Sequence, residues 1–544
     1  MKKLYLFLSI GIIFFGACSN NEIITEQPDD KNFAPQLIAT VEQNDVTTKS
    51  GVIEDNDYTF GEKFYWTNGD ATTVFFVNGS MTHQTQYKKV EYSADVAAGV
   101  QSSSAAFNVV QADIIDNGEY TAYGLFPTAA WETRTNYIDF MTVNMPAYQM
   151  QTQANSEHLG AYMLMKAASS VTVGGNSPIA LTYKHLASVI RFAVWNNSGD
   201  NNLKLANINV KLNSGKAVFA TQAKLADIDA ALLTVDNLSN VPGLTLQLTG
   251  DAQNFSTKDG KNQCEGYMAV LPTATDAFES SDDLIIELSF MDGTNNYLVT
   301  KTYNIGTSLN FLSNGMEQGK SYYFQLEVGS GDLNAITGTS YAVGDYWPDN
   351  ANPEGIVFWL KPGRFGTRGK VVGLGETYIS KWGLENDEQA AGVTGIRSLT
   401  DGAAATRNLI LKYRESPTFN IDYPAFFHIY TLVNGGNENG VWYLPARNEL
   451  NALYAGYNGR VYESIMNWVG YMPGYDSAEC INARQAFNTK LTTKNGDAFS
   501  SNGDWYLSSS EISDKRNYSF TFANGSGSAD DKTYDGNIRW IRNF

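Results

Sequence analysis

The chain has 544 residues, enough for three or four ordinary domains, and its apolar content of 43% argues against global disorder. The formal net charge of −19 argues against a general nucleic-acid-binding protein, because such a protein needs a basic face. The 31 Tyr residues, set among many Gly, Asn and Asp turns, favour β structure.

The N-terminus carries the features of an export signal. Lys2 and Lys3 precede an apolar stretch over residues 4–15, which is short for a membrane-spanning helix. Phe15-Gly16-Ala17-Cys18 follows and resembles a bacterial lipobox. The resemblance implies that residues 1–17 are a lipoprotein signal peptide and that a lipid on Cys18 anchors the chain in the outer membrane, at the cell surface. The alternative is an ordinary secretory signal that happens to contain a cysteine.

Residues 18–50 are polar and predict a tether. A strand is expected at residues 36–41, and Lys49 lies in a polar stretch shortly after it. This strand is a candidate for removal after export. No Arg precedes Arg134, so Lys49 is the predicted processing point if the strand is cut away.

Residues 51–197 predict strand after strand with turns between them. Several residues in this part follow the order found in the first domain of the fimbrillin-like family, whose members are lipoprotein subunits of pili. They are Trp66, Gly69, Asp70, Pro146, Gln149, His158, Leu159, Gly160, His185 and Leu186.

Residues 198–329 continue the strand pattern and end in a segment that resembles the final strand of a fimbrillin subunit. The resemblance implies a mainly β fold with two transthyretin-like β-sandwich domains, over 51–197 and 198–329. It also implies pilus subunits as partners, through strand addition: a groove left by the N-terminal strand accepts a strand of another subunit.

Residues 330–340 are small and polar and predict a linker. Beyond them, helices are expected at residues 401–413, 425–432, 448–457 and 477–491. The motifs WYLPARNEL at 442–450, WYLSSSE at 505–511 and IRWIRNF at 538–544 occur in this part. In that order they resemble the C-type-lectin-like fold shared with formylglycine-generating enzymes, which implies an α+β domain over 341–544.

The sequence predicts no enzyme, no metal site and no cofactor. The formylglycine-generating enzymes use a pair of cysteines, and this region holds only Cys480. The chain has four His residues and shows no catalytic motif around them, and the calcium motifs of lectins are missing. Cys264 and Cys480 fall in different domains, so each is expected to be a buried single thiol.

Ligand binding is predicted for loops of the C-terminal domain. Trp468, Tyr471 and Tyr475 occur in a stretch interrupted by Gly and Pro, and Asn502 and Asp504 precede Trp505. Aromatic faces with polar neighbours suit a glycan or protein ligand. The alternative is that these aromatic rings fill the domain's own core.

Together these features predict a cell-surface adhesin, a minor or tip subunit of a fimbria that accepts a donor strand and binds a host or bacterial ligand through its C-terminal domain. A tip position is expected because a globular domain follows the fimbrillin part, where a stalk subunit carries its donor strand. Two alternatives remain, a free-standing glycan-binding surface lipoprotein and a glycan-active enzyme with an acid pair in a cleft.

Overall fold

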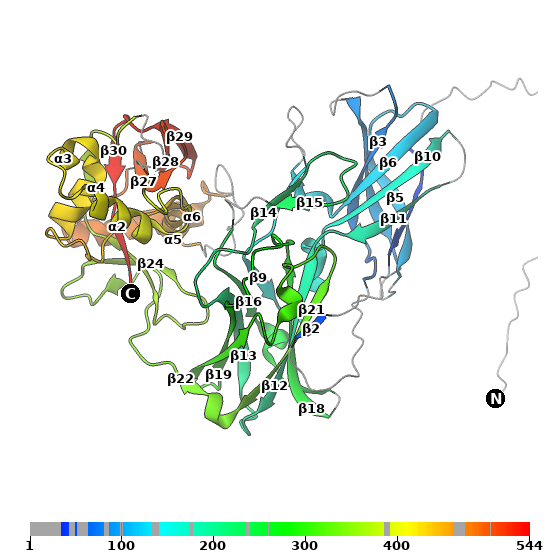
Figure 1. Cartoon of the computed structure of the whole chain (residues 1–544), viewed down its shortest axis with the longest axis horizontal. Coiled ribbons are helices and arrows are strands. Elements are labelled where there is room, and N and C mark those ends of the chain that lie inside the picture. Colours follow the sequence, from blue (N-terminus) through cyan, green and yellow to red (C-terminus); the bar gives the residue numbers. More distant parts are fainter. Residues whose placement is uncertain are drawn as a thin grey trace, which may run out of the picture.

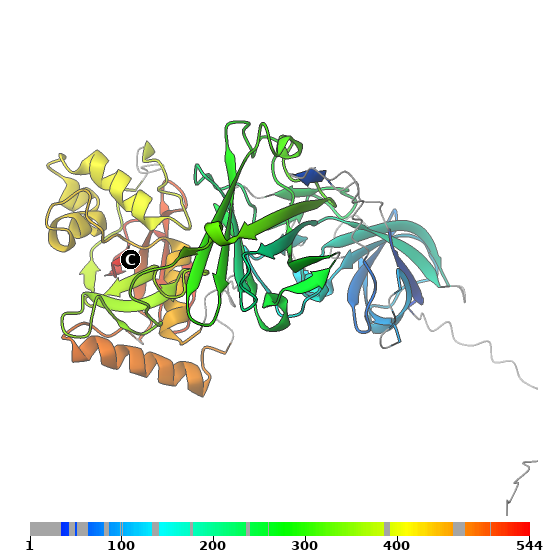
Figure 2. The same ribbon diagram turned by 90° about the horizontal axis from the view of Figure 1, so that it is seen from below.

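The computed structural model describes residues 34–42, 49–51, 64–80, 86–97, 100, 102–132, 141–174, 178–235, 240–258, 260–385, 392–460, 474–500 and 502–544. Strands dominate these residues, and the α-helices gather in the last third of the chain, which agrees with the mainly β prediction. Figure 1 shows three bodies, a barrel, a sandwich and a C-terminal region (residues 341–544). Figure 2 shows them in a row, with the barrel and the C-terminal region at opposite ends.

The barrel is a sheet of seven strands that closes on itself in the order β1-β11-β10-β6-β3-β4-β5. Apolar residues alternate with polar ones along these strands, and the apolar face fills the interior with large side chains such as Trp66, Tyr92 and Tyr183. The strands are β1 (Leu37–Val41), β3 (Ala71–Val77), β4 (Lys88–Asp95), β5 (Ser104–Ala112), β6 (Gly118–Phe126), β10 (Met165–Val173) and β11 (Ile179–His185). The closed sheet differs from the two-sheet sandwich expected here, because β1 joins the edges that β5 and β11 would otherwise leave open.

The sandwich packs a five-stranded sheet, β17-β18-β12-β21-β2, against a six-stranded sheet, β22-β20-β19-β13-β16-β9. Its core consists of Leu, Ile, Val and Phe side chains from both inner faces. The strands are β2 (Lys49–Gly51), β9 (Tyr148–Gln151), β12 (Ser188–Asn197), β13 (Lys204–Leu212), β16 (Gly243–Leu248), β17 (Ser256–Lys258), β18 (Lys261–Val270), β19 (Asp283–Met291), β20 (Asn296–Asn304), β21 (Ser321–Gly329) and β22 (Asn334–Ala335).

Strand pairing does not follow the expected boundary at residue 197. The strand β12 pairs with β18 and β21, and β9 pairs with β16, so both belong to the sandwich although they precede that boundary. A small sheet, β15-β14-β8-β7, also combines strands from before and after that boundary. Its strands are β7 (Trp131–Glu132), β8 (Thr142–Asn144), β14 (Gln222–Leu225) and β15 (Leu233–Val235).

One apolar cluster contains residues of both the barrel and the sandwich. Phe75 and Leu125 from barrel strands pack in it with Val189, Tyr267 and Ala269 from sandwich strands. This apolar cluster spans both bodies without a polar break. No local feature of the sequence therefore marks where one body ends, and the expected boundary at residue 197 was misplaced.

Two buried glutamines fix β9 against the opposite sheet. Gln149 donates to the carbonyl of Ala269 at 2.6 Å and accepts from the amide of Ala269 at 2.9 Å. Gln151 makes the same kind of pair with β18, donating to Glu265 and accepting from Tyr267. A buried amide is tolerated only when its donor and acceptor are both satisfied, and here the strand backbone satisfies them.

The expected linker at residues 330–340 is partly ordered. Residues 330–332 form a single 3₁₀ turn, and β22 then pairs with β20 at the edge of the sandwich. An ion pair of 3.1 Å between Lys301 and Asp332 holds this segment against the sheet.

The C-terminal region has two sheets, β23-β24-β25-β31 and β26-β30-β27-β28-β29, with helices around them. The strands are β23 (Tyr346–Trp347), β24 (Gly355–Leu360), β25 (Gly369–Gly373), β26 (Thr377–Ile379), β27 (Trp505–Glu511), β28 (Arg516–Thr521), β29 (Gly527–Asp531), β30 (Gly536–Ile538) and β31 (Ile541–Asn543). The helices are α2 (Gly402–Tyr413), α3 (Phe419–Asp422), α4 (Pro424–His428), α5 (Arg447–Tyr457) and α6 (Ala478–Thr493), and a π turn, η8 (Ile429–Val433), follows α4.

All four helices expected from the sequence are present, and α2 and α6 begin after side-chain caps from Asp401 and Ser477. The helix expected at 425–432 changes to a π turn after His428. Cys264 and Cys480 are buried free thiols, as expected. Within the described part of the chain, no helix is long and apolar enough to cross a membrane.

A fully buried ion pair joins the end of β27 to the residue that follows β29, within one sheet of the C-terminal region. Lys532 and Glu511 have no exposed surface on their side chains and lie 2.5 Å apart. Arg397 donates to the other oxygen of Glu511, and the ring of Trp382 lies 5.2 Å from the Lys532 ammonium. A buried pair of this kind is costly to break because the remaining charge has no partner.

Glu511→Gln is therefore expected to destabilise the C-terminal region by about 3–5 kcal/mol. Hydrogen exchange of the β27 amides measures this loss in the full chain. The matched control is Glu479→Gln, since Glu479 is 87% exposed and lies 3.9 Å from Arg460. Similar small losses in both variants would contradict the role given to the buried pair.

Candidate functional site

The first candidate site is the place of β1 in the barrel, which we call the slot. The strand β1 runs parallel to β11, from Leu37 opposite Ile179 to Val41 opposite Tyr183. On its other side it runs antiparallel to β5, from Leu37 opposite Phe107 to Thr40 opposite Ser104. A single short strand thus completes two ladders of backbone hydrogen bonds.

The side chains of β1 alternate between the barrel interior and the surface. Leu37, Ala39 and Val41 are 1%, 0% and 2% exposed, whereas Ile38 is 38% exposed. The indole of Trp66 donates to the carbonyl of Ala39 at 2.9 Å. Without β1, the slot would be an apolar groove with an unpaired strand edge on each side, which is the kind of edge that accepts a strand from another chain.

The predicted processing point follows β1 closely in the sequence but lies in another body. Lys49 opens β2, whose backbone pairs in parallel with Tyr322 of β21 in the sandwich. Residues 43–48, between β1 and β2, lie outside the described residues. A cut at Lys49 therefore requires β2 to leave β21, and three residues of edge strand are a weak barrier.

The predicted ligand and lipid residues are only partly within the described chain. Cys18, Trp468 and Tyr471 lie outside it. Tyr475 is half-buried, packs against the core of the C-terminal region, and its carbonyl accepts from Arg484 at 2.7 Å. Asn502 and Asp504 are exposed in the loop before β27.

The second candidate site is a groove around Trp442, which the sequence alone would place in the core. Tyr443 and Leu444 are buried in two different apolar clusters, whereas Trp442 is only half-buried. Asn434 fixes its backbone, donating to the Trp442 carbonyl at 2.8 Å. Two hollows of about 460 and 370 Å³ share Trp442 as a wall, which we call the Trp442 groove.

Trp442 lies among aromatic, apolar and charged side chains. Arg542 lies 4.2 Å from the ring of Trp347 and 5.4 Å from that of Trp442, and it pairs with Glu354 at 2.9 Å. Trp540 and His428 line the smaller hollow, and burial lowers the pKa of His428. Leu432, which the π turn η8 carries, is 73% exposed beside them.

This arrangement suits a ligand with flat apolar faces and hydroxyl groups. Indole rings stack on such faces, and Asn434, Asn439 and Glu438 offer hydrogen bonds in the larger hollow. No group of three or more His, Cys, Asp or Glu side chains that could hold a metal occurs among the residues that the structure describes. This groove was not predicted, because Trp442 and residues 538–544 were interpreted only as motifs of the fold. The turn at residues 434–441 was a usable signal for an exposed Trp.

The slot makes a position-specific prediction. Ala39→Asp would place a carboxylate inside the barrel, so we expect a loss of roughly 3 kcal/mol or more and fast hydrogen exchange of the β1 amides. The control is Ile38→Asp, which introduces the same carboxylate on the outward face of β1. It should lower the free energy of unfolding by no more than about 1 kcal/mol. Equal exchange in the two variants would contradict the packing of β1 in the slot.

Comparisons with known proteins place the chain in a family. The sequence matches the model of the family described as fimbrillin-like over residues 46–345, and no curated protein matches it. A fimbrial protein from Bacteroides ovatus ATCC 8483 is 15% identical, aligns with 94% of this chain and 100% of its own, and has a TM-score of 0.26. The fimbrial anchor protein Mfa2 from Porphyromonas gingivalis is 11% identical over 54% of this chain and 91% of its own, with a TM-score of 0.24. Because the family match covers more than half of the 544 residues, the chain belongs to the fimbrillin-like family.

Proposed function

We propose that the protein is a fimbrial adhesion subunit at the cell surface, which accepts a donor strand in the slot and binds a ligand through its C-terminal region. The observation that carries the proposal is that β1 alone closes the barrel, with paired neighbours on both sides. Membership of the fimbrillin-like family supports a surface, pilus-associated location and other pilus subunits as partners.

The arrangement of the three bodies supports a position at the tip. The slot lies in the barrel, and the C-terminal region lies at the opposite end of the row (Figure 2). The strand β31 pairs with β25 inside its own sheet, so it is not free to enter another subunit. A subunit joined to its neighbour through the slot would therefore present the C-terminal region outward.

The C-terminal region is proposed to be a C-type-lectin-like domain without catalytic activity. Its two sheets and surrounding helices fit the α+β domain expected from the motifs at 442–450, 505–511 and 538–544. The Trp442 groove is the proposed ligand site, and the stretch with Trp468, Tyr471 and Tyr475, together with Asn502 and Asp504, is the other candidate. Binding is proposed to be independent of calcium.

Fimbriae sheared from the producing bacterium provide a test of whether the chain is assembled into them. We expect the chain in sheared fimbriae, in far fewer copies than the stalk subunit, and with an N-terminus that follows Lys49, as found by mass spectrometry. Lipid on Cys18 should precede this cut, so Cys18→Ser should lower the amount in the membrane fraction and stall processing.

A fimbrial chain that still begins at Cys18 would mean that β1 keeps the slot closed, which contradicts the acceptor role. Absence from fimbriae, with the lipidated chain intact on the surface, would instead favour the free-standing glycan-binding lipoprotein.

The ligand site is tested with the full chain on a panel of host and bacterial glycans, with and without EDTA. We expect binding that EDTA leaves unchanged and that Trp442→Ala weakens about tenfold or more, because a central aromatic contact is removed. Trp195→Ala, a half-buried Trp in the sandwich, is the matched control.

Loss of binding in EDTA would overturn the calcium-independent site. Full binding by Trp442→Ala, with loss in an Asn502→Ala, Asp504→Ala variant, would move the site to the loop before β27.

A further inference from the structure

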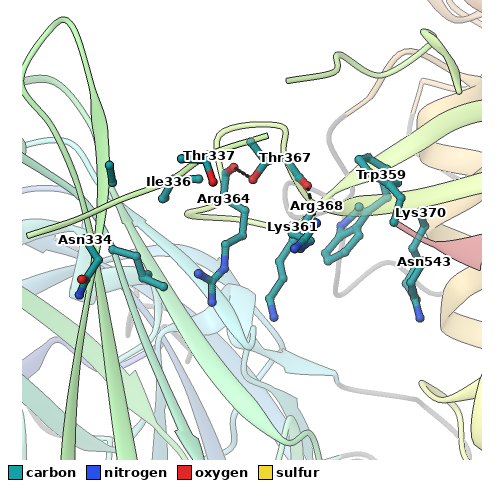
Figure 3. Close-up of a pocket in the computed structure, with 14 residues that line it drawn as sticks. Asn334, Ile336, Thr337, Trp359, Lys361, Arg364, Thr367, Arg368, Lys370 and Asn543 are labelled. Carbon is teal, nitrogen blue, oxygen red and sulfur yellow. Dashed lines mark hydrogen bonds between the residues drawn. The ribbon is translucent and has the colours of Figure 1, made fainter. Parts of the chain in front are cut away.

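A cleft of about 690 Å³ lies at the junction of the sandwich and the C-terminal region. One wall is the segment 334–337 at the edge of the sandwich, and the other is the hairpin of β24 and β25. Figure 3 shows Arg364 and Lys361 side by side, extending from the loop of this hairpin into the cleft, with Trp359 next to them. The volume is in the range typical of small-ligand sites.

The cleft is basic in a strongly acidic chain. Lys361, Arg364, Arg368 and Lys370 line it, and all four occur within ten residues that contain no Asp or Glu. Arg364 pairs with Glu287 at 2.8 Å, and Lys370 pairs with Glu449 at 2.7 Å. These two cations therefore belong to the fold, and the first of them ties the C-terminal region to the sandwich.

The other two cations have no such partner. Among the described residues, no carboxylate forms an ion pair with Lys361 or Arg368, and Arg368 makes a single long hydrogen bond of 3.3 Å to the carbonyl of Thr367. Desolvation and the repulsion of the nearby Lys211 ammonium lower the pKa of Lys361, and the Glu287 carboxylate opposes this shift. An anion bound between Lys361 and Arg368 would relieve this repulsion and accept charge-assisted hydrogen bonds.

The remaining lining indicates what carries the anion. The ring of Trp359 and the amide of Asn543 line the cleft on the side of the C-terminal region, and the amide of Asn334 and the hydroxyl of Thr337 line it on the sandwich side (Figure 3). An aromatic face beside amide and hydroxyl groups suits a sugar ring with its hydroxyls. An inorganic anion would use the two cations but not the Trp or the amides.

We propose that this junction cleft binds an acidic saccharide, a sugar that carries a carboxylate or a sulfate, with Lys361 and Arg368 on the anion and Trp359 against the ring. The cleft shares Asn543 with the larger hollow of the Trp442 groove, but Lys361, Arg368 and Trp359 line the cleft and not that groove. The proposal therefore does not depend on the strand-acceptor role or on the ligand of that groove.

Calorimetry on the full chain tests the proposal with four probes: trigalacturonic acid, a heparin hexasaccharide, the neutral cellotriose and inorganic sulfate. We expect one or both acidic saccharides to bind, more weakly at high salt, and at least about tenfold more tightly than cellotriose or sulfate. Trigalacturonic acid carries carboxylates alone, so its binding would show that a carboxylate is sufficient. Binding of the heparin hexasaccharide alone, which carries both groups, would show that a sulfate is required.

The variant Lys361→Gln, Arg368→Gln should weaken this binding about tenfold or more, because both charged contacts are lost. Lys412→Gln, an exposed cation on α2, is the matched control and should bind as the native chain does. Trp359→Phe keeps an aromatic wall, and Trp359→Leu removes it, so only the second should weaken binding further if the ring stacks.

The proposal is overturned if neither acidic saccharide binds, if cellotriose or sulfate binds as tightly as they do, or if the Gln variant, with an unchanged melting profile, binds as the native chain does. If Lys412→Gln weakens binding as much as the Lys361→Gln, Arg368→Gln variant does, the binding reflects general charge attraction. That result would also overturn the proposal.

Discussion

The architecture of the first body depends on one five-residue strand. The strand β1 supplies backbone partners to β11 and to β5, and Leu37, Ala39 and Val41 fill the barrel between them. Burial of Leu37 and Val41 contributes roughly 1.5–3 kcal/mol each, so the strand stabilises the barrel without being irreplaceable. Another strand with the same alternation of apolar residues could take its place and restore both ladders.

Different kinds of contact connect the three bodies. The barrel and the sandwich share an apolar cluster, and Gln149 and Gln151 tie β9 to the opposite sheet through paired amide hydrogen bonds. The sandwich and the C-terminal region are joined by polar contacts instead, with Glu287 between Lys211 and Arg364. If β1 were exchanged for another strand, the apolar cluster between the barrel and the sandwich would remain intact.

Periodicity and turn chemistry predicted most of the elements. The strand at residues 36–41 and the helices α2, α5 and α6 were predicted because local sequence alone determines them. The assignment of β12 to the first domain was wrong because nothing local in Ser188–Asn197 tells which body it will pair with. The partial exposure of Trp442 could not be predicted for a similar reason: its backbone is held by the side chain of Asn434, eight residues away.

The candidate sites were harder to predict than the fold. The slot could be predicted from the resemblance to fimbrillins, but the junction cleft needs two segments, 334–337 and 359–370, that only the folded chain brings together. The basic residues from Lys361 to Lys370 were visible in the sequence, and their concentration in a chain of net charge −19 was a usable signal. Which of them are neutralised depends on Glu287 and Glu449, which are distant in the sequence.

The acceptor role of the slot can be tested by locking β1 in place. Ile38 and Ala106 are partners on neighbouring strands, and both face outward, so Ile38→Cys with Ala106→Cys can form a disulfide in the oxidising cell envelope. The measurement is the amount of this doubly substituted chain in sheared fimbriae, after mass spectrometry has verified the disulfide, against a chain with Ile38→Cys alone. We expect the locked chain to reach the surface but to be missing from fimbriae, whereas the chain with Ile38→Cys alone should be incorporated. Equal incorporation of both would contradict strand exchange at the slot.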